Sequence, residues 1–226
     1  MKKKKLPGWI QNVHLAGLLQ SVPGVLLSYW LFQGMLYMDS RERIFKILVD
    51  ILLMVLFWSF GAPFLMAIIL AHTVNMLING HCFAMLSHMG VGATEPTEFI
   101  GYVERLQGRI QQQRFLLGAA AYGSLSKNIF RATSDIDIRV FPEKGSFGWP
   151  KAVFWVFTER FRALINSFPL DVYAFDFDII DAKMKADEPP IIFFDPQGDI
   201  AGKYRNHVQF GDFLHDFKAK HLHEPG

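Results

Sequence analysis

Charge is missing from two long parts of this 226-residue sequence. No Asp, Glu, Lys or Arg occurs in the 33 residues from Leu6 to Met38 or in the 40 residues from Ile51 to Gly90. Uncharged runs of this length and apolarity are untypical of a soluble enzyme and indicate contact with a membrane. Cysteine is also scarce: the one thiol, Cys82, excludes an intramolecular disulfide framework and leaves a reducing compartment open.

The remaining charge divides the chain at about the same place. Residues 1–91 carry seven Lys or Arg and three Asp or Glu, whereas residues 92–226 carry sixteen and eighteen. Nucleic acid binding needs a basic surface, so the weakly acidic second part argues against a stable complex with nucleic acid. We therefore expect two domains, a membrane-embedded helical anchor over residues 1–91 and a mixed α/β domain over residues 92–226.

The stretch from Phe45 to Leu86 carries the strongest membrane signal. About 20 apolar residues span a bilayer, so Ile51–Ala71 would be long enough. Gly61-Ala62-Pro63 interrupts this run, and proline breaks or kinks a helix. The alternatives are one kinked span or a hairpin of two shorter helices that turns at Gly61–Pro63. In the earlier uncharged run, Pro23-Gly24 makes a similar division.

Cationic segments flank both apolar runs. Lys2 to Lys5 and a predicted loop from Asp39 to Lys46 are rich in Lys and Arg, and the positive-inside rule places both in the cytoplasm. We therefore favour hairpins that enter and leave on one side, with the lysines attracted to an anionic leaflet. A secretory signal is the alternative for the first residues, but a clear small-residue cleavage site is missing. His72, Asn75 and Asn79 share a helical face and predict a hydrogen-bonded seam between helices.

The second part of the chain holds a pattern of glycine and carboxylates. A helix is predicted over residues 97–114, followed by a buried strand, FLLGAAAYG, that ends at Gly123-Ser124. After a short polar segment, SDIDIRVF alternates as a strand and places Asp135, Asp137 and Arg139 on one face. Like charges on one face of a strand repel each other and gain nothing in packing. The pattern therefore indicates a cation between the two aspartates.

One more helix and one more strand complete the pattern. The helix, GWPKAVFWVFTERFRALINSF, includes Arg160, for which we expect a salt bridge or a packing role. The strand, PLDVYAFDF, carries Asp171 near its start, while Asp176 and Asp178 approach its end and are expected to be solvated. The residues that follow are expected to form turns and short elements.

Together these segments resemble the DNA polymerase beta superfamily of nucleotidyltransferases, in its minimal, small-domain form. The resemblance rests on Gly123-Ser124, on Asp135-Ile136-Asp137-Ile138 after ten intervening residues, and on Leu170-Asp171-Val172. It covers about residues 98–180. It implies a nucleotidyltransferase-type mixed sheet flanked by helices. The reaction it implies moves a nucleoside monophosphate from an NTP to an acceptor hydroxyl, and pyrophosphate leaves.

The resemblance also implies a metal site. Asp135, Asp137 and Asp171 would be the catalytic carboxylates and would bind two Mg²⁺ ions, with Mn²⁺ as an alternative. Two such ions stabilise the charge on the attacking and leaving oxygens of an in-line displacement. Mg²⁺ keeps water and phosphate oxygens among its ligands, so a few protein carboxylates are sufficient.

Four further residues would bind the nucleotide. Gly123 would let the backbone approach the triphosphate, and the Ser124 hydroxyl would donate to a phosphate oxygen. The family often has Arg-Gly where this chain has Lys127-Asn128, and lysine lacks the planar fork with which arginine binds phosphate. Arg139 could supplement Lys127.

The sequence thus predicts a membrane-anchored nucleotidyltransferase with its C-terminal domain on the cytoplasmic side. The acceptor would be a lipid-linked or envelope-glycan intermediate, because anchoring helps most when the acceptor is also confined to the membrane. Two alternatives stay open. The chain could be a catalytically weak partner or antitoxin-like regulatory module of the same fold, or it could transfer the nucleotide to a protein.

Overall fold

A computed structural model of the chain describes residues 21–80, 82–83, 86, 93–127, 129–145, 147–178 and 189–222, with the backbone alone at Val22 and Ser124. The predictions for Lys2 to Lys5 therefore lie outside the described residues. The helices are α3 (Val22–Phe32), α4 (Ser40–Ser59), α5 (Phe64–Asn79), α7 (Pro96–Gln111), the 3₁₀ helix η1 (Ser124–Lys127), α8 (Gly148–Ile165), α9 (Asp199–Lys203) and α10 (Phe210–His221). The strands are β1 (Leu116–Tyr122), β2 (Ile136–Pro142), β3 (Leu170–Ala174), β4 (Ile191–Phe194) and β5 (Val208–Gln209).

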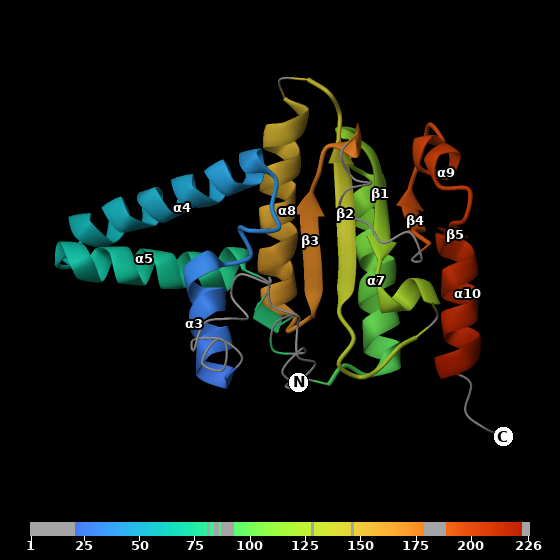
Figure 1. The fold of residues 1–226 in the computed structure, drawn as a ribbon, viewed down its shortest axis with the longest axis horizontal. Helices are drawn as coiled ribbons and strands as arrows, with labels where there is room; N and C mark the ends of the chain where they lie inside the picture. The colour runs from blue at the N-terminus through green and yellow to red at the C-terminus, as the bar shows by residue number, and fades with distance from the viewer. Residues whose placement is uncertain are drawn as a thin grey trace, which may run out of the picture.

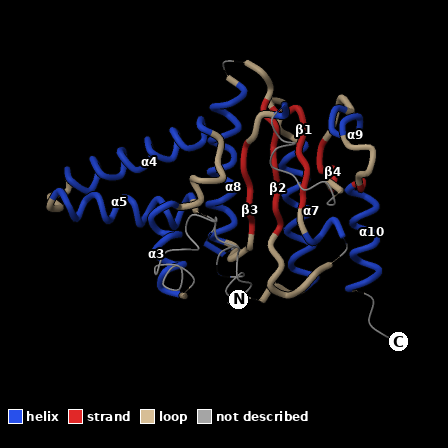
Figure 2. Tube along the Cα trace, in the orientation of Figure 1, coloured by secondary structure: helices blue, strands red, loops and turns tan. Residues whose placement is uncertain are grey.

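The five strands form one mixed sheet in the order β3-β2-β1-β4-β5. The central strand β1 runs antiparallel to β2 and β4, and the outer pairs β2–β3 and β4–β5 are parallel. In Figures 1 and 2, α7 lies behind the strands, α8 lies alongside β3, and α10 lies at the opposite edge, near β4 and β5. This arrangement confirms the predicted mixed sheet flanked by helices.

The main hydrophobic core lies between the sheet and these three helices. Side chains alternate between the two faces of a strand, and every second residue of β2 enters this core and is fully buried: Ile136, Ile138 and Val140. The predicted apolar stripe of α7 packs into the same core and is also fully buried: Phe99, Val103, Leu106 and Ile110. The helical and strand periods of the sequence therefore identify this core correctly.

Helices α4 and α5 form a hairpin that projects past the edge strand β3 (Figure 1). Helix α4 ends at Ser59 and α5 begins at Phe64, so the prediction of a turn at Gly61–Pro63 is confirmed and a single helix over Ile51–Ala71 is wrong. Gly61 has φ +89°, a left-handed backbone conformation that residues other than glycine rarely adopt. Glycine therefore permits the reversal, and proline cannot continue α4 because it lacks the amide hydrogen.

The predicted loop over Asp39–Lys46 is wrong, because α4 begins at Ser40. The Asp39 carboxylate accepts a hydrogen bond from the Arg41 amide (2.9 Å) and caps the helix. Glu42 and Lys46 on the next turns are buried. Glu42 pairs with Arg160, and Lys46 donates to the Gln33 and Asn79 carbonyl oxygens. The charge pattern of the segment alone does not reveal these partners.

No helix in the described part of the chain is long and apolar enough to cross a membrane. How the hairpin lies relative to a bilayer stays a prediction. Large apolar side chains are nevertheless exposed along both helices, among them Leu52 and Leu65, each 69% exposed. The C-terminal quarter is also more regular than predicted, because β4 enters the sheet beside β1 and α10 buries Phe213 and Phe217.

Candidate functional site

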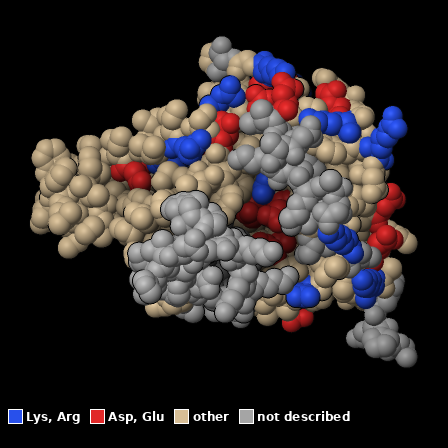
Figure 3. All heavy atoms as spheres, viewed as in Figure 1, with Lys and Arg blue, Asp and Glu red and all other residues tan. Residues whose placement is uncertain are grey.

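Asp137 and Asp171 lie opposite each other on the parallel strands β2 and β3. Their positions in register place both side chains on the sheet face opposite the main core, since Ile136 and Ile138 point the other way. Figure 3 views this side of the molecule and shows acidic side chains gathered over β2 and β3. The structure therefore brings together two of the three predicted carboxylates.

The pKa of the Asp137 carboxyl group is perturbed by its surroundings. Burial of the carboxyl group, the charge of Asp171 and a hydrogen bond to Asp171 raise the pKa of Asp137 well above its usual value, while Arg139 acts in the opposite direction. Two carboxylates at hydrogen-bond distance cannot both ionise without a large electrostatic cost. The pair therefore holds a proton or attracts a cation.

Gly123 lies beside the pair, at the end of β1. Its φ of +93° is in the left-handed region, and a Cβ at this position would lie 2.9 Å from Asp137 Oδ2. The following turn is closed by the Ser126 hydroxyl, which donates to the Gly123 carbonyl oxygen at 2.8 Å. Glycine is therefore required here both by the backbone conformation and by the space next to the carboxylate.

Arg139 extends over the same face. It donates to the Ile138 and Asp171 carbonyl oxygens at 3.0 and 3.3 Å, and its Nη2 lies 3.8 Å from Asp137 Oδ1. Its guanidinium is 4.7 Å from the centre of the Tyr173 ring. A stacked arginine at this place has the charge and the planar donors that phosphate binding needs.

The structure relates the other predicted site residues less directly to the Asp137–Asp171 pair. Asp135 comes one residue before β2 and is half-buried, and its charge contributes to the raised pKa of Asp137. Lys127 ends η1 and is exposed. The side chain of Ser124 lies outside the described part of the structure. Their predicted roles at the site stay predictions.

The pair fits a divalent cation in the chemistry of its donors. Carboxylate oxygens are the protein ligands that Mg²⁺ prefers, and a cation would relieve the repulsion that raises the pKa of Asp137. Among the described residues, however, no group of three or more His, Cys, Asp or Glu side chains is arranged to hold a metal ion. Asp137 and Asp171 would therefore share a bound cation with ligands from the substrate or from water.

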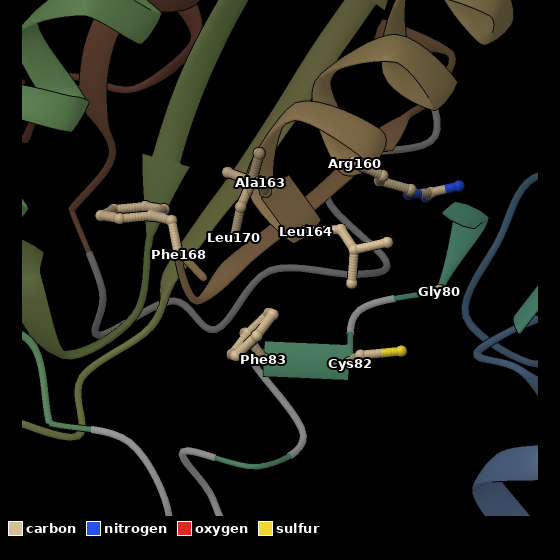
Figure 4. A pocket seen from close by; sticks show the side chains of 8 residues that line it. All are labelled: Gly80, Cys82, Phe83, Arg160, Ala163, Leu164, Phe168 and Leu170. Carbon is tan, nitrogen blue, oxygen red and sulfur yellow. The ribbon is translucent and has the colours of Figure 1, made fainter. Parts of the chain in front are cut away.

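Two cavities lie away from the carboxylate pair. One of about 10 Å³, shown in Figure 4, lies between α8 and the residues after α5, and Phe83, Leu164 and Phe168 line part of it. This volume admits about one water molecule. The other, of about 500 Å³, lies near the opposite edge of the sheet and is lined by parts of α7, β4, α9 and α10. Neither includes a predicted site residue in its lining.

A buried polar network lies beside β3. The sequence analysis assigned a structural role to one of its members but did not predict the network. Arg160 of α8 pairs with Glu42 of α4, and Arg160 Nη1 donates to Asn79 Oδ1 at 3.0 Å. Lys46 donates to the Asn79 carbonyl oxygen at 2.7 Å. The structural role expected for Arg160 is thus confirmed. Charged residues inside apolar helices, as at Glu42 and Lys46, were the available signal.

The predicted seam of the hairpin is present. Asn75 donates to Asp50 Oδ1 and to the Lys46 carbonyl oxygen, both at 2.9 Å. His72 lies 3.1 Å from Asp50 Oδ2, with its other ring nitrogen 2.9 Å from the Trp30 carbonyl oxygen. The polar residues of α5 therefore join α3, α4 and α5, and their polar atoms face protein.

No protein-family model, no curated protein and no solved structure matches this chain. The functional assignment accordingly depends on the residues and their geometry.

Proposed function

We propose that this protein is a membrane-anchored nucleotidyltransferase of the DNA polymerase beta type, which moves a nucleoside monophosphate from a Mg²⁺-bound NTP to an acceptor hydroxyl. The observation that carries the proposal is the pairing of Asp137 with Asp171 beside Gly123. A cation bound there would neutralise phosphate charge as the bond to the leaving pyrophosphate breaks.

The chain's own residues have three tasks in this reaction. Asp137 and Asp171 hold the cation, with Asp135 as the third predicted carboxylate. The left-handed turn at Gly123 leaves room for a triphosphate beside Asp137, since no Cβ occupies that space. Arg139 orients the phosphate oxygens from the same sheet face. Ser124 and Lys127, which begin and end η1, would add phosphate contacts.

The exposed hairpin supports the membrane part of the proposal. Helix α5 buries Ala67, Ala71 and Asn75 on the side toward α4, while large apolar side chains on its other sides are exposed. Small residues let helices approach closely in lipid. With 16 residues, α5 is about 24 Å long, so the hairpin would enter the lipid from one side and return, with the sheet on the cytoplasmic side. An acceptor in the same leaflet, a lipid-linked or envelope-glycan intermediate, would then be within reach.

The second candidate function is a catalytically weak partner or regulatory module of this fold. It is favoured by the lack of a three-ligand metal cluster among the described residues. Transfer to a protein acceptor would use the same carboxylate pair and differ only in the acceptor.

One experiment separates these functions. Detergent-purified protein is incubated with Mg²⁺, native membrane extract and each of the four NTPs labelled at the α-phosphate. We expect label to enter the lipid fraction with the wild type and not with Asp137→Asn or Asp171→Asn. Asp178→Asn is the matched control, because its carboxylate pairs with Lys144 at the surface, where both side chains are more than 60% exposed.

Each result has a definite meaning. Label in protein instead of lipid would identify a protein acceptor. Equal incorporation by the wild type and Asp137→Asn would exclude the carboxylate pair as the reaction site. If the wild type neither transfers label nor binds an NTP, the result favours the second candidate function, a catalytically weak partner or regulatory module.

A further inference from the structure

The edge strand β3 has backbone groups on the side away from β2. It is the terminal strand of the described sheet, next to β2 alone. The Phe175 amide donates to the Val140 carbonyl oxygen of β2, so the alternation of the strand turns the Ala174 amide and the Val172 carbonyl toward the edge away from β2. Free edges of this kind recruit other strands unless something covers them.

Two charged side chains take the place of a neighbouring strand. Glu42 Oε2 accepts a hydrogen bond from the Ala174 amide (3.1 Å), and Arg160 Nη2 donates to the Val172 carbonyl oxygen (2.6 Å). The two side chains also form an ion pair with each other and are buried, at 1% and 2% exposure. Together they provide hydrogen-bond partners for one backbone donor, the Ala174 amide, and one backbone acceptor, the Val172 carbonyl oxygen, at this edge of β3.

This pair connects the edge of β3 to the start of α4 and the end of α5, which together form the base of the hairpin. Glu42 comes from the first turns of α4. Asn79, at the end of α5, accepts from Arg160 Nη1, and its carbonyl oxygen accepts from Lys46. In Figure 4 the Arg160 side chain leaves α8 on the side toward Gly80, away from Phe168. The hairpin base therefore binds Arg160 from two helices.

The pair also reaches the candidate site. The Arg160 guanidinium lies 5.1 Å from the centre of the Tyr173 ring, and the Arg139 guanidinium lies 4.7 Å from the same ring. Arg139 in turn donates to the Asp171 carbonyl oxygen. A continuous set of contacts thus leads from the hairpin base through Tyr173 to the residues that face Asp137.

We propose that Glu42 and Arg160 are positioning residues, which hold β3 at its free edge so that Asp171 stays in register with Asp137. The inference rests on the proposed function, because it assigns this alignment to cation and phosphate binding. It gives the hairpin a second role besides anchoring: it supplies part of the framework of the site.

The test compares two buried carboxylates in the full-length protein. Glu42→Gln removes the charge that pairs with Arg160. The control is Glu159→Gln, since Glu159 of α8 is fully buried and pairs with Arg109 of α7 and with Arg162 of its own helix. Mn²⁺ binding is measured by electron paramagnetic resonance on samples whose folded fraction is matched by near-ultraviolet circular dichroism.

We expect the Kd for Mn²⁺ to rise at least tenfold in Glu42→Gln and to change less than twofold in Glu159→Gln. If the wild type shows transfer activity, kcat should fall in Glu42→Gln while KM for the acceptor stays the same. A role in stability alone would leave the Kd of the folded fraction unchanged, and equal values for the two variants would overturn the proposal. If Glu42→Gln does not fold, the milder Asn79→Ala should change the Kd in the same direction.

A second measurement separates this inference from the proposed function. Hydrogen exchange followed by mass spectrometry is read on a peptide over residues 170–175. If the wild type binds no Mn²⁺, the proposed metal site fails, and the exchange decides the role of the pair. Faster exchange of this peptide in Glu42→Gln than in Glu159→Gln would show that the ion pair holds β3, and equal exchange would overturn that role.

Discussion

Asp137 and Asp171 are paired in register across β2 and β3, and burial together with the charge of Asp171 raises the pKa of Asp137. Two like charges at this distance oppose folding unless a proton or a cation lies between them. Under the proposed function, the same pairing that destabilises the metal-free protein would create a site for a cation. Active sites commonly keep such destabilising arrangements for function.

Asp171→Asn should therefore have opposite effects with and without metal. In EDTA we expect the variant to be more stable than the wild type, because the amide removes the charge of Asp171 that helps to raise the pKa of Asp137. Mg²⁺ at about 100 times its Kd should stabilise the wild type by about 2.7 kcal/mol and the variant hardly at all. Thermal unfolding in the presence of EDTA or Mg²⁺ measures both effects. An equal Mg²⁺ response in the two proteins would contradict the assigned ligand.

Gly123→Ala should destabilise the protein by about 1–3 kcal/mol, because a non-glycine residue is strained in this backbone region. The new Cβ would also lie 2.9 Å from Asp137 Oδ2 and displace the carboxylate. The control is Gly108→Ala in α7, where a Cβ meets nothing within 4 Å, and which should be neutral or slightly stabilising. Chemical denaturation compares the two. Similar stability for both variants would show that the turn at Gly123 accepts a side chain.

Lys46 should make stability depend on pH. Burial, followed by the charge of Arg160, lowers the pKa of Lys46 from 10.5 to about 7. Between these values the unfolded chain binds a proton that the folded protein does not, so the free energy of unfolding should rise with pH by up to about 1.4 kcal/mol per unit. Below about pH 7 both states are protonated, and this contribution is constant.

The comparison with Lys46→Met isolates this contribution. Denaturation midpoints of both proteins at pH 7, 8 and 9 should diverge, with the wild type gaining stability relative to the variant as the pH rises. Parallel curves would mean that Lys46 keeps its charge in the folded protein, stabilised by the Gln33 and Asn79 carbonyl oxygens that accept its hydrogen bonds.

The hairpin should bind lipid through its exposed apolar side chains. Leu52→Glu and Leu65→Glu each place a charge where a leucine is 69% exposed, and burying that charge in lipid costs about 2.5 kcal/mol or more. Co-flotation with vesicles that contain anionic lipid should therefore fall severalfold for both variants. Ile129→Glu, at an exposed apolar residue outside the hairpin, is the control and should float like the wild type. If all three float equally, the hairpin is not the lipid-binding surface.

Much of the local structure follows from the sequence alone. The helical stripe from Phe99 to Ile110 and the alternation around Asp137 depend on residues a few positions apart, and both are found as predicted. The same is true of the turn at Gly61 and Pro63, because these two residues act on the backbone at their own positions. Local patterns of this kind need no knowledge of distant partners.

Only the tertiary structure decides which of these elements meet. Nothing local in the sequence specifies that Asp171 lies opposite Asp137, because strand register depends on the packing of the whole sheet. Glu42 and Arg160 are 118 residues apart. The sequence predicts a salt bridge or a packing role for Arg160 but does not specify Glu42 as its partner. The two residues are buried together because the hairpin base and α8 pack against the edge of β3, where the Ala174 amide and the Val172 carbonyl oxygen need hydrogen-bond partners.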